Sequence, residues 1–135
     1  MLLFGNEKQI NNSSGAPGPI SVPSTTVVYS RSFRLNYGQS FGAWYQAGNG
    51  SGIANMKIEL EQSYIAPATE GSADANFVIG VGVAPIETSL SGNTAVVKAI
   101  TPVPMKHARL KITGLGSNPS DATLNFWLFE QGLSG

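Results

Sequence analysis

The fold is decided by residues 106–132, which read KHARLKITGLGSNPSDATLNFWLFEQG. Two runs in this stretch alternate apolar with polar residues, the first through Ala108, Leu110 and Ile112 and the second through Ala122, Leu124, Phe126 and Leu128. A period of two places each apolar set on one face of a β-strand, and that face has to find a core. Between the runs, residues 114–121 are rich in Gly, Asn, Ser and Pro, which bend the backbone at low cost. The stretch therefore predicts two antiparallel strands joined by one loop, each with one buried face and one face in water.

The chain ahead of this stretch contains further runs of the same kind, separated by turn residues. They span residues 25–30, 33–37, 41–47, 54–64, 76–83, 86–90 and 94–100. No helix of consequence is indicated, and the Cys–Trp–Cys pattern of immunoglobulin domains is absent because the chain has no cysteine. We therefore predict an all-β fold, a single antiparallel β-sandwich of about eight strands formed by residues 25–135, with a jelly roll favoured over an immunoglobulin-like sandwich.

Residues 1–24 are predicted to form an extended, flexible N-terminal arm ahead of this domain. Residues 11–19 form a polar tract that contains two prolines, and proline cannot serve a central strand. A frayed terminus is the ordinary state of such a segment. The interpretation that we favour is an arm that docks its apolar tip, Leu2, Leu3 and Phe4, on a neighbouring subunit.

The composition bounds the kinds of partner that we expect. Charged residues make up 12% of the 135 residues, and eight basic and eight acidic side chains give a formal net charge of zero. A chain with so little charge has little field with which to attract phosphate backbones or anionic lipid, so we expect no nucleic acid and no membrane partner. No apolar run approaches the roughly 20 residues of a membrane span, and the apolar start stops too early for a signal peptide. Low charge also removes a protection against association, which favours a domain that works inside an assembly.

Three residues are the candidates for catalytic or metal chemistry. His107 is the chain's one histidine and is predicted on a water-facing side of its strand, beside Arg109, with no sequence pattern that supplies a nucleophile or an orienting acid. Glu59 and Glu61 share one face of a strand, a spacing that could serve glycoside hydrolysis or calcium binding. Cross-strand ion pairing with Arg109 and Lys111 is the plainer interpretation of these two carboxylates. We therefore expect no enzyme activity, no cofactor and no metal site.

The aromatic residues are the better candidates for binding. Since Phe126 and Leu128 are assigned to the core, Trp127 and Phe129 have to point outward. They either lie under a loop or arm of the same chain, contact a partner subunit, or stack on sugar rings. Trp44 has the same three alternatives, because Tyr45 is the better core residue of that strand.

The final segment resembles a known group of proteins. The residues that carry the resemblance are Leu110–Gly114 and Asp121–Leu128, which look like the closing hairpin of small β-sandwich virion proteins of tailed bacteriophages. Within that group the chain is most similar to capsid decoration, or cement, proteins. The resemblance implies a non-enzymatic jelly roll that sits on the capsid lattice, often as a trimer, and braces neighbouring capsomers. The family has no signature residues to transfer to this chain.

The leading hypothesis is therefore a virion structural protein, located in the virion after assembly in the host cytoplasm. Its partners are expected to be further copies of itself, with a trimer favoured, and a major capsid or other virion protein. The predicted partner-binding residues are Leu2, Leu3, Phe4, Trp44, Trp127 and Phe129. The alternative is a carbohydrate-binding β-sandwich, a receptor-binding or lectin-like module with a glycan as its ligand.

Overall fold

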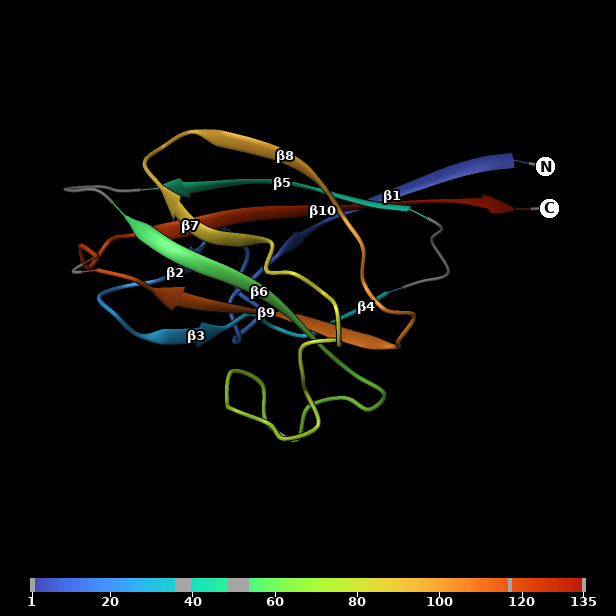
Figure 1. Ribbon diagram of the computed structural model, residues 1–135, viewed down its shortest axis with the longest axis horizontal. Helices are drawn as coiled ribbons and strands as arrows, with labels where there is room; N and C mark the ends of the chain where they lie inside the picture. Colours follow the sequence, from blue (N-terminus) through green and yellow to red (C-terminus); the bar gives the residue numbers. More distant parts are fainter. Residues whose placement is uncertain (1, 36–39, 49–53, 117, 135) are drawn as a thin grey trace.

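The structure, a computed structural model, describes residues 2–35, 40–48, 54–116 and 118–134, with residues 2–5 and 133–134 described by their backbone only. The described residues contain ten β-strands and no helix, arranged as two antiparallel sheets that pack face to face (Figure 1). The first sheet consists of β1 (Leu2–Ile10), β2 (Ile20–Ser21), β5 (Ser40–Gly48), β8 (Ala95–Ile100) and β10 (Thr123–Ser134). The second consists of β3 (Val27–Tyr29), β4 (Phe33–Arg34), β6 (Asn55–Ser63), β7 (Glu87–Ser91) and β9 (His107–Gly114). The predicted all-β sandwich is confirmed.

The strands pair in a nested order. β1 pairs with β10, β3 and β4 pair with β9, β5 pairs with β8, and β6 pairs with β7. A long antiparallel ribbon that turns between β6 and β7 and then folds over on itself produces this order. Pairing of β10 with β5 completes the sheet β1-β10-β5-β8, and pairing of β9 with β6 completes the sheet β3-β9-β6-β7. This arrangement is a jelly roll, as the sequence predicts.

The core lies between the two sheets and takes side chains from both. Its large, fully buried apolar members are Ile10, Ile20, Tyr45, Met56, Ile58, Leu110, Ile112, Leu124, Phe126 and Leu128. Tyr45 and Phe126 lie opposite each other on β5 and β10, and their rings stack with centroids 5.3 Å apart. Burial of such side chains stabilises the fold by about 1.5–3 kcal/mol each. Trp44 lies on the other face of β5, so Tyr45 is the core residue of this strand, as predicted.

Residues 106–132 form β9 and β10, with the buried faces that their alternation predicts. The two strands do not form a hairpin, because β9 belongs to the second sheet and β10 to the first. The loop between them crosses from sheet to sheet, a distance of roughly 10 Å between packed sheets. Asn118 fixes this crossing, since its Oδ1 accepts a hydrogen bond from Asn55 N at 3.0 Å and its Nδ2 donates to Val22 O at 3.1 Å. The predicted closing hairpin is therefore wrong, and the loop instead forms an arch that connects the two sheets.

The N-terminal segment is part of the sandwich, which corrects both the predicted arm and the predicted domain start at residue 25. β1 pairs with β10 along the whole of Leu2–Ile10. Ile10, Ile20 and Val22 are buried in the core. The physical reason is that β10 is an inner strand of its sheet, so the space beside it has to be filled by another strand. The polar tract with its prolines is the connection between β1 and β2 rather than a tether.

Residues 76–83 form no strand, although their alternation predicts one. They belong to the connection between β6 and β7, residues 64–86. Most of this connection lies below β6 and β9 in the view of Figure 1, on the side of the second sheet away from the core, while Ile86 at its end is buried in the core. Of the alternating apolar residues only Phe77 is buried, while Val81 is fully exposed. Gly82 has a φ of 80°, a turn conformation that a regular strand does not contain. The one bridge described here joins Val78 to Gln62. We call residues 64–86 the covering loop.

The covering loop buries the outward-pointing face of β9 that was predicted to lie in water. Arg109 is fully buried between the rings of Tyr29 and Phe77, with its Cζ 4.0 Å and 4.6 Å from their centroids. Its Nε donates a hydrogen bond to Glu61 Oε1 at 2.9 Å, and its Nη1 donates to Ser72 O at 2.7 Å. Cross-strand ion pairing is therefore confirmed for Glu61, in a buried setting that the alternation did not indicate.

Candidate functional site

Two tryptophans lie side by side on the outer face of the first sheet. Trp127 of β10 is directly opposite Trp44 of β5, and Trp44 is directly opposite Val97 of β8. Residues that are directly opposite each other in an antiparallel pair project from the same face. Trp127 is 38% exposed and Val97 is 82% exposed, while Trp44 is half-buried. A row of three apolar side chains therefore crosses three neighbouring strands at the surface.

A second row lies beside the first. Phe129 of β10 is 44% exposed and directly opposite Gly42 of β5. Because Gly42 has no side chain, the surface next to Phe129 is left open. A Cβ atom added at Gly42 would meet Lys98 O at 3.8 Å, an ordinary contact distance. We call the surface formed by the two rows the aromatic face; it consists of Gly42, Trp44, Val97, Trp127 and Phe129.

Neutral amide side chains border the aromatic face. Gln9 Nε2 donates a hydrogen bond to Asn125 Oδ1 at 3.0 Å, and Gln9 Oε1 accepts one from Gly18 N at 3.2 Å. Gln46 Nε2 donates to Asn93 O. These amides are therefore held in place by bonds within the chain, and part of their hydrogen-bonding capacity is already used.

Among the described residues, no segment covers the aromatic face. The exposed fractions of Trp127 and Phe129 show this directly, and the covering loop lies against the other sheet (Figure 1). Of the three interpretations of the outward aromatic residues, the exposed fractions of Trp127 and Phe129 favour the two that leave part of the rings free for a ligand or partner. These two are contact with a partner and stacking on a sugar.

The structure brings together three of the six predicted partner-binding residues. Trp44, Trp127 and Phe129 share the aromatic face. The backbone of Leu2–Phe4 pairs with residues 132–134 at the far end of β10, beyond Gln131, where the pairing of β10 with β5 ends. Gly42 and Val97 were missed by the sequence interpretation. Alternation places Val97 on the outer face of its strand, but only the order of the strands shows that this strand neighbours Trp44.

His107 lies at the start of β9, on the far side of the sandwich from the aromatic face. Across the strands it faces Arg34 of β4 and Ser63 of β6. Ser63 Oγ accepts a hydrogen bond from Ile65 N at 3.1 Å. Burial first, and then the positive charges of Arg34 and Lys106, hold the pKa of His107 below its ordinary value, with Glu70 opposing them. The imidazole is consequently neutral near pH 7.

The two carboxylates considered for chemistry both have cationic neighbours. Glu61 is bonded to Arg109, and Glu59 Oε2 lies 3.6 Å from Lys57 Nζ on the same strand. Glu59 is also opposite Lys111 in the register of β6 with β9. Within the described ranges, no cluster of three or more His, Asp or Glu side chains suits a metal ion. In the same ranges, no helix is long and apolar enough to cross a membrane.

Comparison with known proteins adds no relative. No protein-family model matches the chain. A search of curated proteins gave no significant match. The function therefore has to be inferred from the residues of this chain.

Proposed function

We propose that the protein is a non-enzymatic virion structural protein, a capsid decoration or cement protein that braces neighbouring subunits through its aromatic face. The observation that carries this proposal is the open row of Trp44 and Trp127 with Phe129 beside it. Monomeric proteins rarely expose contiguous apolar patches without a functional reason. Aromatic side chains near the centre of an interface contribute most of its binding energy.

The composition supports a protein partner over a charged ligand. With 12% charged residues and zero formal net charge, the chain has little long-range attraction for anions or cations. The residues of the aromatic face are themselves uncharged, and one carboxylate, that of the exposed Glu7, borders the face directly opposite Phe129. Contact with a second apolar surface would have to leave this carboxylate at its edge, in water. Association through this face is therefore expected to be driven by burial of apolar area.

The architecture also supports the proposal. Jelly rolls recur in viral capsid proteins and in lectins. On a capsid lattice many identical copies bind at once, so a modest contact per copy is strengthened by avidity. The partners that we propose are further copies of this chain, with a trimer favoured, and a major capsid or other virion protein. The place of action would be the virion, after assembly in the host cytoplasm.

The outer ends of β1 and β10 offer a second contact to the same partner. Residues 2–4 and 132–134 continue as a pair of strands past the last residue of β10 that pairs with β5 (Figure 1). A two-stranded ribbon is only marginally stable without further packing. We propose that a neighbouring subunit packs against this ribbon, which keeps Leu2, Leu3 and Phe4, whose side chains lie outside the described part of the structure, as partner-binding residues in a paired ribbon.

Carbohydrate binding is the second candidate, and one specific observation favours it. Trp44 and Trp127 are flanked by the amides of Gln9, Gln46 and Asn125, and an aromatic platform with amides beside it suits a sugar ring. Against it, Gln9 and Gln46 already hold hydrogen bonds within the chain. A sugar hydroxyl would have to compete with these bonds, whereas an apolar protein surface would leave them in place.

The test is the mass of the protein in solution, measured by multi-angle light scattering over a range of concentrations. The wild type is compared with Trp127→Ser/Phe129→Ser, and with Val81→Ser as the control, because Val81 is a fully exposed apolar residue on the covering loop. We expect the wild type and Val81→Ser to form the same oligomer. The double variant should dissociate at about thirtyfold higher concentration, the effect of losing about 2 kcal/mol of interface energy.

A monomeric wild type that binds a glycan on an array, with binding lost in Trp44→Ser, would overturn the proposal in favour of the second candidate. An oligomer whose mass is unchanged in the double variant would show that the aromatic face is not the interface.

A further inference from the structure

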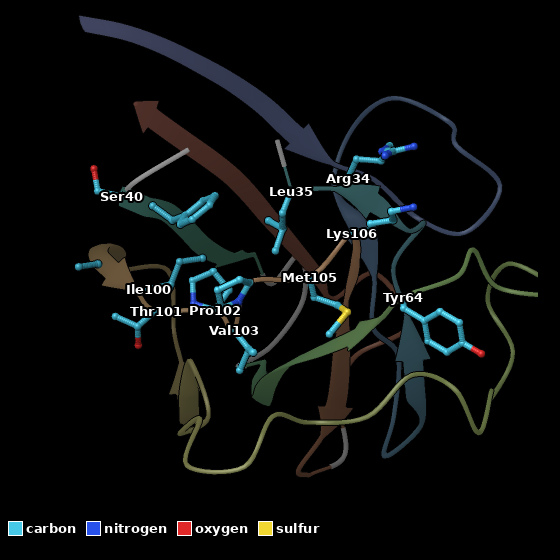
Figure 2. A pocket seen from close by; sticks show the side chains of 13 residues that line it. Arg34, Leu35, Ser40, Tyr64, Ile100, Thr101, Pro102, Val103, Met105 and Lys106 are labelled. Atoms are coloured by element: carbon cyan, nitrogen blue, oxygen red, sulfur yellow. The ribbon is translucent and has the colours of Figure 1, made fainter. Parts of the chain in front are cut away.

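A second candidate site lies at one end of the sandwich, where the two sheets part. It is a pocket of about 980 Å³. The start of β5 and the end of β8 form its wall on the first sheet, and Arg34 of β4 and Tyr64 after β6 lie on the second. The connection from β8 to β9, residues 101–106, closes it from the side (Figure 2). Pockets that bind small ligands have volumes of about 300–1,000 Å³, so the size fits a ligand.

The wall of the pocket is mostly apolar and continuous with the core. Leu35, Phe41 and Ile100 line it and pack at the same time against the core cluster. Val103 and Met105 add further apolar surface and are 37% and 39% exposed. The hydrophobic core is therefore left open at this end, and an apolar ligand would cap it. The removal of this surface from water is the driving force for binding.

The wall is also fixed in position before any ligand arrives. The side chain of Gln62 holds Val103 from both sides, since its Nε2 donates to Val103 O at 2.7 Å and its Oε1 accepts from Val103 N at 3.0 Å. Leu35 N donates to Lys106 O at 3.1 Å, which ties the two sides of the pocket together. Pro102 lies in the same connection and has a fixed φ. A preformed wall lowers the entropy cost of binding.

The charges at the pocket are of one sign. Arg34 and Lys106 are exposed and lie on the same side, together with Tyr64, while Ile100, Pro102 and Val103 lie on the other side (Figure 2). None of the described residues that line the pocket is acidic. The pKa of the neighbouring His107 is lowered first by burial and then by Arg34 and Lys106, while Glu70 opposes them.

An apolar cavity with two cations at one rim fits an amphipathic anion. We propose that this pocket binds a single-chain fatty acid as its carboxylate, with the acyl chain against Leu35, Phe41 and Ile100 and the carboxylate at Arg34 and Lys106. Cations on flexible side chains at a rim suit a carboxylate that stays partly hydrated, while the chain displaces water from the wall. The site is separate from the association proposed above and does not depend on it.

The test is isothermal titration calorimetry of the full chain with laurate below its micellar concentration, and with dodecanol as the uncharged counterpart. Arg34→Gln/Lys106→Gln removes the rim charges. Lys57→Gln/Lys111→Gln removes the same charge from the outer face of the second sheet, outside the pocket, and is the matched control. Thr101→Trp fills the pocket from an exposed position of its wall. Thermal denaturation of each variant checks that the fold is kept.

We expect laurate to bind the wild type more tightly than dodecanol does. The affinity for laurate should fall about tenfold in Arg34→Gln/Lys106→Gln, while the affinity for dodecanol stays the same. Lys57→Gln/Lys111→Gln should bind both ligands as the wild type does, and Thr101→Trp should lose both. The proposal is overturned if laurate does not bind, if both charge variants weaken it equally, or if Thr101→Trp binds it unchanged. Binding of an acidic, apolar peptide in place of laurate would also overturn it and assign the pocket to a protein partner.

Discussion

The outer face of the second sheet is covered by a loop, whereas the outer face of the first sheet is open. On the second sheet the covering loop buries a charged residue, Arg109, whose guanidinium lies between the ring of Phe77 from this loop and the ring of Tyr29. On the first sheet Trp127 and Phe129 lie open, with Gln9 and the exposed Glu7 of β1 directly opposite them. Alternation in the sequence marks the outward residues of both sheets as exposed, yet it is the cation that is hidden and the aromatic rings that are not. Exposure of an outward residue is thus decided by what the connections cover, and strand periodicity carries no information about this.

The side chains on each outer face explain why a loop covers one face and not the other. Hydrogen bonds and the contact of Phe77 with the Arg109 guanidinium hold the covering loop. Glu70 accepts hydrogen bonds from Ser32 N at 2.9 Å and from Ser32 Oγ at 2.6 Å, and Arg109 donates one to Ser72 O. A buried guanidinium needs such partners, because an unpaired buried charge is strongly unfavourable. The aromatic face has few groups that could tie down a loop of the chain, but its apolar area suits a second surface of the same kind.

The largest expected effect on stability comes from removing one partner of the buried ion pair on the covered face. Arg109→Met leaves the carboxylate of Glu61 buried without its cation, and should lower the free energy of unfolding by about 3–5 kcal/mol. Urea denaturation measures this loss, and hydrogen exchange should show that the covering loop has lost protection. Replacing both partners, in Glu61→Met/Arg109→Met, should recover a large part of the loss because no buried charge is then left.

The partly exposed pair of Lys57 and Glu59 is the control for this prediction. Lys57→Met removes a cation that is 38% exposed and lies 3.6 Å from Glu59, and should change the free energy of unfolding by at most about 1 kcal/mol. Equal effects of Arg109→Met and Lys57→Met would contradict the distinction between a buried and a partly exposed ion pair.

A charge placed on the aromatic face should separate association from folding. Gly42→Lys introduces an ammonium group into the second row, directly opposite Phe129, where a Cβ has room. We expect oligomer dissociation at about tenfold higher concentration, because the new charge would have to be buried on association. The melting temperature of the monomer should not fall, since glycine is unfavourable within a strand. Analytical ultracentrifugation and calorimetry measure the two quantities.

Gly116→Lys is the matched substitution, because it lies in the loop between β9 and β10 and a Cβ there meets nothing within 4 Å. It should leave the oligomer intact. If both lysine variants dissociate it, the cause is net charge and not the aromatic face.

The smallest expected effect is a pH dependence of the covering loop. Asp74 accepts hydrogen bonds from Asn76 N at 2.9 Å and from Ala68 N at 3.2 Å, and these bonds hold the pKa of Asp74 below its ordinary value of 3.8. A depressed pKa means that the ionised form stabilises the folded loop. This contribution is present above about pH 4 and is lost as the pH falls through the lower pKa of the folded state.

Amide exchange of Ala68 and Asn76, followed by NMR and normalised to intrinsic rates, should therefore quicken below about pH 3.8, while exchange in β9 does not change over the same range. Asp74→Asn removes the titrating group and should remove this dependence. An identical pH profile in Asp74→Asn would assign the effect to another group.

Periodicity predicts the inner faces of the strands well and the rest of the molecule poorly. Met56, Ile58 and Leu60 are buried as their alternation indicates, because the face of a strand depends only on neighbouring residues. The alternation around Phe77 failed because one buried ring and two glycines can produce the same pattern in a loop. The place of β1 beside β10 could not be predicted, since that pairing joins the two ends of the chain.

The same limit of periodicity explains why only part of the candidate site could be predicted. That Trp127 points outward follows from the core assignment of its neighbours in the chain. That Trp44 and Val97 lie beside it depends on strand order, which is a property of the whole fold. The pocket formed by residues such as Arg34, Phe41 and Lys106 had no signal in the sequence, because its walls come from four separate segments.

The nested pairing also determines when the first sheet can form during synthesis and folding. β10 comes last in sequence among the described strands and yet forms the interior of the first sheet, where β1, β2 and β5 all pair with it. Contacts that close such long loops of chain are slow to form. During synthesis the first sheet cannot close until the residues of β10 have left the ribosome. Because Trp127 and Phe129 are on that strand, the aromatic face that we propose for association is complete only once β10 has paired with β5.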